Sequence, residues 1–243
     1  MCFVSLLVLN KSHGQTTVDS ANSVQNAINT TNNLFNKAIG QQSSLYNGTK
    51  YYFYNPVKIR GFAYFQDTIA SPGNVNYDGV QYNGVELFYD LYKDEVITIL
   101  FDKYSYFSLL KEGVQHFDLL NHHFININAD TLTNNSVIKS GYYDELYRGP
   151  SQVLVKITKV IEPVQISIGT PDAYSIFSKP IQKFFIRKNS VYYSVSSEGD
   201  LLAILNDRKK QLKNYIRANR IKFRKTPGQV LASAAAYYDS LSN

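Results

Sequence analysis

The stretch Val75–Phe101, VNYDGVQYNGVELFYDLYKDEVITILF, decides the fold class of this chain. Apolar and polar residues alternate along it, which is the period of a half-buried β-strand. An Asp-Gly pair at 78–79 separates two alternating runs, and this pair is the strongest local signal for a two-residue hairpin turn. The Asn-Gly pair at 83–84 predicts either a second turn or a glycine bulge. The acidic turn at 93–95 leads into one more strand, so the stretch predicts an antiparallel sheet.

Similar runs continue on both sides, with turn residues between them. They predict strands at Tyr51–Tyr54, Ile59–Phe65, Tyr106–Leu110, Val114–Leu119, Phe124–Ile127, Gly141–Tyr147, Val153–Val160, Phe184–Arg187 and Val191–Val195. The 20 Tyr residues of the chain point the same way, because Tyr suits a half-buried pleated surface. No strand–helix–strand spacing appears, which argues against a parallel sheet. We therefore predict an antiparallel, curved β-meander or a partly closed barrel over residues 49–195.

After this region the period changes to that of a helix, over residues 200–241. Asp200 is placed to cap a short turn, and a basic helix follows from Asn206 to about Ala218. The sequence Thr-Pro-Gly-Gln at 226–229 fits a capping box with Pro at the first helical position, before a last helix with an apolar stripe. This C-terminal helical pair makes the predicted fold α+β, in a single domain over residues 49–243.

The N-terminal residues predict export. Phe3–Leu9 is a short apolar run, and Ser12-His13-Gly14 is a small-residue exit, so residues 1–14 read as a signal peptide. The run is far shorter than the ~20 residues that span a bilayer, and we expect no transmembrane segment in the mature chain. No Lys or Arg precedes the run, which suits a start codon placed too far downstream; a buried N-terminal strand is the alternative. Residues 15–48 are predicted to be a helical or a flexible leader.

Two stretches of the sequence resemble a known family. The first is the hairpin sequence YDGVQY at 77–82 with its continuation VELFYDL at 85–91; the second is LKNYIR at 212–217 with YYDSL at 237–241. Together they resemble a family of uncharacterised exported proteins of Bacteroidetes-type bacteria. The resemblance implies a periplasmic or secreted location in the cell envelope and one co-folded unit. It implies no activity and no catalytic residue.

The histidines and carboxylates are the first places to look for chemistry. His116, Asp118, His122 and His123 lie within eight positions. His122 and His123 are adjacent and would point to opposite faces of a strand, whereas His116 and His122 could share a ligand across a hairpin with Asp118 as a third group. Surface or turn histidines are the simpler interpretation, and we predict no metal site.

Acidic pairs near the turns could serve a hydrolase, but a turn rich in acids is more often solvated. These acids are Asp90, Asp94, Glu95, Asp144 and Glu145. Phosphate-loop and dinucleotide fingerprints are absent, and no cofactor is expected. Removal of the signal peptide would also remove the only Cys, so no disulfide or thiol chemistry is expected.

The net charge of +6 is concentrated in one segment. Residues 179–225 hold 13 Lys or Arg against three acids, a local balance of +10, which leaves −4 over the rest of the chain. The candidate binding residues are Lys209, Lys210, Lys213, Arg217 and Arg220. Such a segment marks a partner surface or, as the structural alternative, a helix lying on an acidic sheet.

The sequence therefore predicts a non-enzymatic binding or interaction module of the cell envelope. Its basic segment suits an acidic envelope protein, an anionic lipid surface or an acidic glycan, and export argues against nucleic acid. The alternative is a hydrolase acting on envelope glycan or peptide, with the carboxylates or His116, His122 and His123 in its site. A cleft with converging buried acids or histidines would favour the enzyme, and a basic patch without such a cleft would favour the binder.

Overall fold

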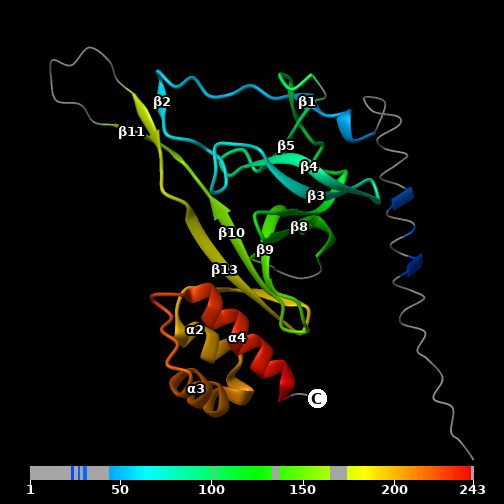
Figure 1. The fold of residues 1–243 in the computed structure, drawn as a ribbon. Coiled ribbons are helices and arrows are strands. Elements are labelled where there is room, and N and C mark those ends of the chain that lie inside the picture. Colours follow the sequence, from blue (N-terminus) through cyan, green and yellow to red (C-terminus); the bar gives the residue numbers. More distant parts are fainter. Residues whose placement is uncertain are drawn as a thin grey trace, which may run out of the picture.

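The protein is built on one large, strongly curved antiparallel sheet with helices packed at one end (Figure 1). The computed structural model describes residues 44–100, 102–132, 137–164 and 174–241, together with Ser23, Val24, Ala27, Thr30 and Thr31. The predicted signal peptide and most of the predicted N-terminal helix lie outside these residues. No helix in the described part of the chain is long and apolar enough to cross a membrane.

The large sheet has eleven strands in the described chain. They are β1 (Thr49–Lys50), β3 (Ser71–Tyr77), β4 (Val80–Asp90), β5 (Glu95–Ile99), β6 (Tyr106–Ser108), β7 (Val114–Leu119), β8 (His122–Ile127), β9 (Gly141–Tyr147), β10 (Val153–Thr158), β13 (Ile181–Lys188) and β14 (Val191–Val195). Their spatial order is β1-β6-β5-β4-β3-β7-β8-β9-β10-β13-β14, so two meanders are joined where β3 pairs with β7. The sheet does not close, with β1 and β14 at its edges, so of the two predicted forms, a curved meander or a partly closed barrel, the structure has the curved meander.

The central hairpin formed as its turn residues predict. Asp78 and Gly79 have φ values of 50° and 77°, the left-handed pair that a tight hairpin turn needs. Gly84 has a φ of 66°, and the β3–β4 register shifts beside it, so the second Asn-Gly pair makes a bulge and not a turn. The Lys188-Asn189-Ser190 turn also joins two paired strands, β13 and β14.

The curvature encloses the main core. Five almost fully buried residues form its centre on the concave face: Val75, Tyr89, Phe117, Phe124 and Tyr142. The four aromatic rings among them meet edge-to-face or stacked. Each comes from a different strand, and each alternates with outward-facing neighbours. At one end the chain after β10 returns to the end of β4, where Lys159 N–H donates to Leu91 O at 3.3 Å.

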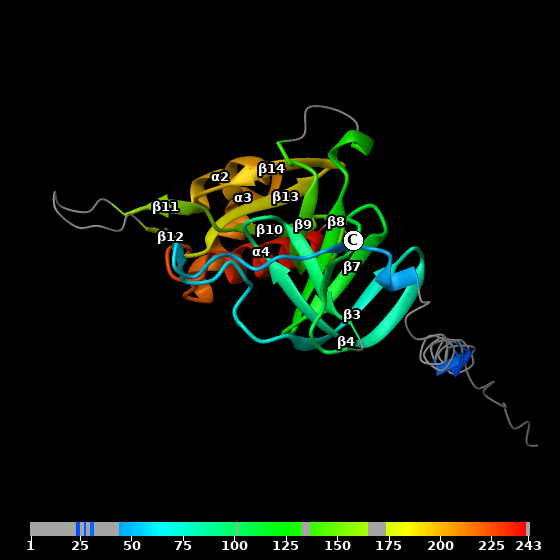
Figure 2. The same ribbon diagram turned by 90° about the horizontal axis from the view of Figure 1, so that it is seen from above.

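A second, smaller sheet was not predicted. It joins β11 (Ile161–Pro163), β12 (Ser175–Phe177) and β2 (Ile59–Arg60), and Figure 2 shows β11 and β12 projecting to one side of the molecule. β12 and β2 run parallel. This pairing is possible because the two strands are far apart in sequence and are not joined by a tight turn. The predicted strand Tyr51–Tyr54 is not a strand: its Tyr51 and Tyr54 hydroxyls donate to Asp90, so side chains hold this segment.

The helices cover the other end of the concave face. They are α2 (Glu198–Ile204), α3 (Lys209–Ala218) and α4 (Pro227–Ser240), with the short 3₁₀ turn η4 (Asn206–Arg208) between α2 and α3. Two other 3₁₀ turns, η2 (Ser44–Tyr46) and η3 (Ala129–Thr131), lie elsewhere in the chain. Val230, Leu231 and Ala234 of α4 are fully buried against β9, β10 and β13. The predicted apolar stripe of the last helix is thus a core stripe.

The predicted helix caps need two corrections. Ser197, and not Asp200, caps α2: the Ser197 hydroxyl accepts from Asp200 N–H at 3.1 Å, while the Asp200 carboxylate accepts from Ser196 N–H. α4 begins at Pro227 as expected, but the Thr226 side chain makes no capping hydrogen bond.

Candidate functional site

The outer face of the central strands carries a row of polar side chains. Asn74 and Asn76 lie on β3, His116 and Asp118 on β7, and His123 on β8; Asn76 is paired with His116, Asn74 with Asp118, and Asp118 with His123. The alternate residues of the same strands point into the core, so the strand period places this row outside. The sequence therefore brings amides, imidazoles and a carboxylate together across three strands.

Hydrogen bonds fix the orientation of this row. Asn74 Oδ1 accepts from Gly84 N–H at 3.3 Å, and Asn74 Nδ2 lies 3.5 Å from Asp118 Oδ2. Asp118 Oδ1 lies 2.6 Å from His123 Nδ1, and Arg148 Nη2 lies 2.8 Å from His123 Nε2. Since arginine only donates, His123 accepts at Nε2 and donates from Nδ1 to Asp118.

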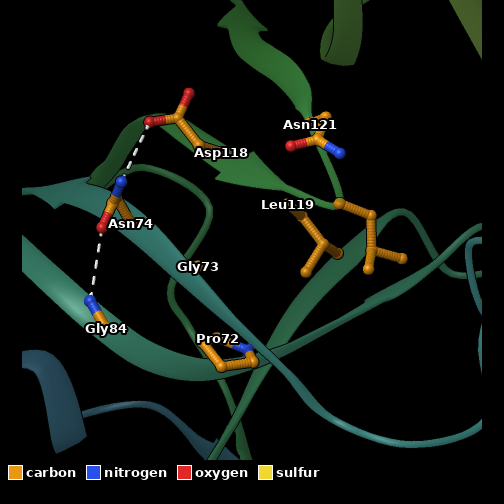
Figure 3. A pocket seen from close by; sticks show the side chains of 8 residues that line it. Pro72, Gly73, Asn74, Gly84, Asp118, Leu119 and Asn121 are labelled. Atoms are coloured by element: carbon orange, nitrogen blue, oxygen red, sulfur yellow. Dashed lines mark hydrogen bonds between the residues drawn. The ribbon is translucent and has the colours of Figure 1, made fainter.

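The row ends at a shallow hollow of about 250 Å³, which we name the turn hollow (Figure 3). Its walls are the Pro72–Asn74 segment of β3, Gly84 of the β4 bulge, and the β7–β8 turn from Asp118 to Asn121. The amide side chains at this place were not predicted as site residues. No local signal marks them, because they converge only through the register of three strands.

His116 and His122 do not share a site, so the alternative of a ligand held between them across the hairpin is wrong. The His116 ring lies 5.2 Å from the His123 ring on the outer face. His122 points to the inner face, where its Nδ1 lies 2.6 Å from Asp144 Oδ2 and its Nε2 lies 3.1 Å from Gln66 Nε2. In the described ranges, no three metal-ligating side chains gather.

The pKa values of the outward-facing His116 and the inward-facing His122 are shifted in opposite directions. Burial lowers the pKa of His116, and the neighbouring His123 adds to the effect. The hydrogen bond to Asp144 raises the pKa of His122 and outweighs the opposing effect of burial. One ring therefore favours its neutral form and the other its charged form.

The acids predicted as solvated turn residues are not solvated: Asp90 and Asp144 are buried, and Asp94, Glu95 and Glu145 are half-buried. Asp94 Oδ1 accepts from Lys156 Nζ and from the Tyr89 hydroxyl, both at 2.6 Å, and Asp94 Oδ2 accepts from Lys111 Nζ at 2.8 Å. Burial acts to raise the pKa of Asp94, but the charge of Lys156 and these hydrogen bonds outweigh it and lower the pKa overall. The cations come from other parts of the chain, which is why the local sequence did not reveal them.

Asp90 is fully buried and serves as a second internal acceptor. Its Oδ2 accepts from the Tyr51 and Tyr54 hydroxyls at 2.7 Å each, and its Oδ1 accepts from the backbone N–H of Tyr92 and Lys93. A carboxylate occupied by four donors holds the N-terminal aromatic segment to the sheet, so its role is structural.

The five predicted binding residues lie together on α3 and the turn after it. Lys209, Lys210, Lys213, Arg217 and Arg220 are all exposed. Lys222, Arg224 and Lys225 in the following loop are exposed too, and residues 208–225 contain no acid. We name these eight side chains the basic surface. Within the described chain none of them forms an ion pair.

The opposite side of α3 explains how the basic surface is held. Leu212 and Ile216 are buried in the helical core, and Tyr215 stacks on Tyr237 of α4 with ring centroids 4.3 Å apart. α3 packs on α2 and α4, and Figure 1 shows it on the side of α4 away from the sheet. α3 therefore rests mainly on the other two helices, and in the described chain its cations form no ion pair with acids of the sheet.

No protein-family model, curated protein or solved structure matches this chain. The resemblance to exported Bacteroidetes-type proteins stays a prediction. Functional inference accordingly rests on the side chains described above.

Proposed function

We propose that this protein is a non-enzymatic binding module of the cell envelope, which captures an acidic protein partner through the basic surface. The observation that carries the proposal is eight exposed cations on α3 and the loop after it, without an ion pair in the described chain. A concentration of one sign of charge steers an oppositely charged partner and fixes its orientation. Export is the part of the proposal that rests on the apolar run Phe3–Leu9 alone.

The chemistry around the basic surface favours a protein over a lipid surface. Helices that bind bilayers insert an apolar face as well as presenting cations. The apolar face of α3 is buried against α4, and between Glu198 and Leu241 no large apolar side chain is exposed. An acidic protein face needs only complementary charge and hydrogen-bond acceptors, which a preorganised row of Lys and Arg can meet.

The hydrolase alternative has less support. The two Asp–His pairs, Asp118 with His123 and Asp144 with His122, lie on opposite faces of the sheet. The second nitrogen of each ring already contacts Arg148 or Gln66, and in the described chain no hydroxyl nucleophile is hydrogen-bonded to either ring. A base needs a nucleophile within hydrogen-bond reach, so neither pair makes a working dyad here.

The test is recovery of the partner from the native host. The tagged chain is expressed there and isolated from the envelope at about 50 mM and about 500 mM salt, since screening removes exposed charge interactions. We expect the wild type to retain a specific acidic protein at low salt and to lose it at high salt. The variant with Lys209, Lys210, Lys213 and Arg217 changed to Gln should fail to retain it even at low salt.

A matched control removes four other exposed cations. Changing Lys58, Lys139, Lys179 and Lys183 to Gln alters the net charge equally but leaves the basic surface intact, so this variant should still capture the partner. Equal capture by both variants, or recovery of lipid or glycan in place of protein, would overturn the proposed partner class.

A further inference from the structure

The turn hollow is a second place where a ligand can bind, independent of the basic surface. It belongs to β3, β4 and the β7–β8 turn, whereas the basic surface belongs to α3 and the loop after it. Its lining combines the carboxylate of Asp118, the side-chain amide of Asn121 and the apolar side chains of Pro72, Leu119 and Leu120 in a small volume (Figure 3). None of this contributes to the capture of an acidic partner.

Glycine at two positions gives the hollow its shape. A Cβ at Gly73 would collide with the Asp118 carbonyl oxygen and would lie 2.8 Å from Leu87 Cδ1, so only glycine allows β3 to approach β7 this closely. Gly84 occupies the bulge at a φ of 66°, and a Cβ there would meet no atom within 4 Å. Because no side chain projects from the bulge, the hollow is open to solvent on the side of Gly84.

The β7–β8 turn forms the opposite wall under backbone strain. Leu120 and Asn121 have φ values of 50° and 64°. Asn tolerates this left-handed region, but a bulky residue such as Leu rarely adopts it. Leu120 packs against the edge of the core and also lines the hollow. These φ values are the angles of a two-residue hairpin turn, and Asn189 and Ser190 have the same pair of values, so the turn geometry fixes the Leu120 side chain at the rim of the hollow.

The polar groups of the hollow are oriented and still have hydrogen-bonding capacity. The side chain of Asp118 is 43% exposed, and each carboxylate oxygen has one partner, His123 or Asn74, out of two acceptor positions. Asn121 is exposed, and its amide has no partner in the described chain. A ligand here would donate to a carboxylate and exchange hydrogen bonds in both directions with an amide.

Charge around the hollow narrows the class of ligand. The Asp118 carboxylate repels anions, and Arg148, which contacts His123 behind it, is itself paired with Glu145 at 2.7 Å. Pro72 and Leu120 supply an apolar contact beside these polar groups. Hydroxyl donors on a ring with an apolar face satisfy all of these conditions.

We propose that the turn hollow binds a neutral sugar unit, whose hydroxyl groups donate to Asp118 and exchange hydrogen bonds with the Asn121 side-chain amide. The volume of about 250 Å³ lies below the usual range for drug-sized ligands and suits one ring. Binding in so open a site is weak for a single unit, and a polymer that presents many units would gain strength by multivalency.

The experiment is an NMR titration of the folded chain with methyl glycosides of glucose, galactose, mannose and N-acetylglucosamine. Each is added to about 50 mM, which covers dissociation constants in the millimolar range. The Asn121 side-chain amide and the Gly84 backbone amide report on the hollow directly. We expect saturable shifts of both signals with at least one of the four probes.

Two variants and one control locate the binding. Asn121→Gly removes the amide while keeping a residue that accepts the positive φ, and Asp118→Asn removes the carboxylate charge. Both should weaken binding at least about tenfold. Asp130→Asn makes the same charge change at an exposed site on η3 and should bind like the wild type.

Absence of saturable shifts with every probe would overturn the proposal, as would wild-type binding by Asn121→Gly. Saturable shifts with methylammonium in place of the sugars would assign the hollow to cations and overturn it equally. Because Asn121 is exposed, its variant keeps the test decisive even if Asp118→Asn does not fold.

Discussion

Two groups of lysines in this protein are used in opposite ways. Lys156, whose side chain is 15% exposed, and Lys111, which is 38% exposed, share the carboxylate of Asp94 at 2.6 and 2.8 Å. Lys209 and Lys213 on α3 face water and have no acid beside them in the described chain. A buried cation requires a partner, because desolvation is costly, whereas an exposed one does not. The paired lysines therefore belong to the fold, and the unpaired ones are available to another molecule.

The largest effect is expected from breaking the buried pairs. Asp94→Asn keeps the shape of the side chain but leaves Lys156 and Lys111 without their counter-charge, and this should cost about 3–5 kcal/mol of unfolding free energy. Urea denaturation at pH 7 measures it. Asp130→Asn, an exposed acid-to-amide change, should stay within about 0.5 kcal/mol of the wild type.

The same ion pairs give this contribution a defined pH dependence. The pKa of Asp94 is lowered in the folded state, so its contribution is fully present above the ordinary aspartate pKa of 3.8 and is lost as the pH falls through the lowered value. The difference in unfolding free energy between the wild type and Asp94→Asn should therefore shrink below pH 4. A difference that is constant with pH would show that Asp94 stabilises by shape alone.

Neighbouring residues of α3 sharpen the comparison on one helix. Leu212 is fully buried, and Leu212→Ala should lower the unfolding free energy by about 2–5 kcal/mol. Lys213 is exposed, and Lys213→Ala should change it by less than about 0.5 kcal/mol while weakening partner capture. Thermal unfolding of both variants checks this. Similar losses in the two would mean that α3 does not have one structural and one free face.

A smaller effect separates the two histidines. The raised pKa of His122 gives stability that is fully present below pH 6.5 and is lost as the pH rises through the folded-state value. The lowered pKa of His116 has the opposite sign: stability is lost as the pH falls below 6.5. NMR titration of the imidazole protons, assigned with His116→Gln and His122→Gln, should place them on opposite sides of 6.5. The reverse order would contradict the assignment of His122 to Asp144.

Local patterns were enough to predict most of the large sheet. The Asp78-Gly79 turn formed because only residues that tolerate positive φ fit there, and Val114–Leu119, Gly141–Tyr147 and Val191–Val195 have the predicted bounds. The predicted strand Ile59–Phe65 formed only over Ile59–Arg60, as β2, and its partners β11 and β12 have three residues each, too few to show a period, so the second sheet was missed. The C-terminal helices were predicted from their apolar spacing.

The site was predicted less completely than the fold. The exposure of the basic surface follows from helical spacing, because the apolar residues Leu212 and Ile216 take the buried side. The neighbour of His116 depends on the register of β7 and β8, which the Leu120-Asn121 turn sets without a glycine signal, so the sequence alone did not distinguish His123 from the alternative His122. The burial of Asp94 depends on Lys156, 62 residues away, and no local pattern contains that information.

The central claim is that the cations of the basic surface are free to bind because the fold does not use them. The most direct measurement compares the wild type with the variant in which Lys209, Lys210, Lys213 and Arg217 are Gln, following both thermal unfolding and partner capture on the same sample. The account predicts a melting temperature within about 2 °C of the wild type, with capture lost at low salt. A large fall in melting temperature, or undiminished capture, would contradict it.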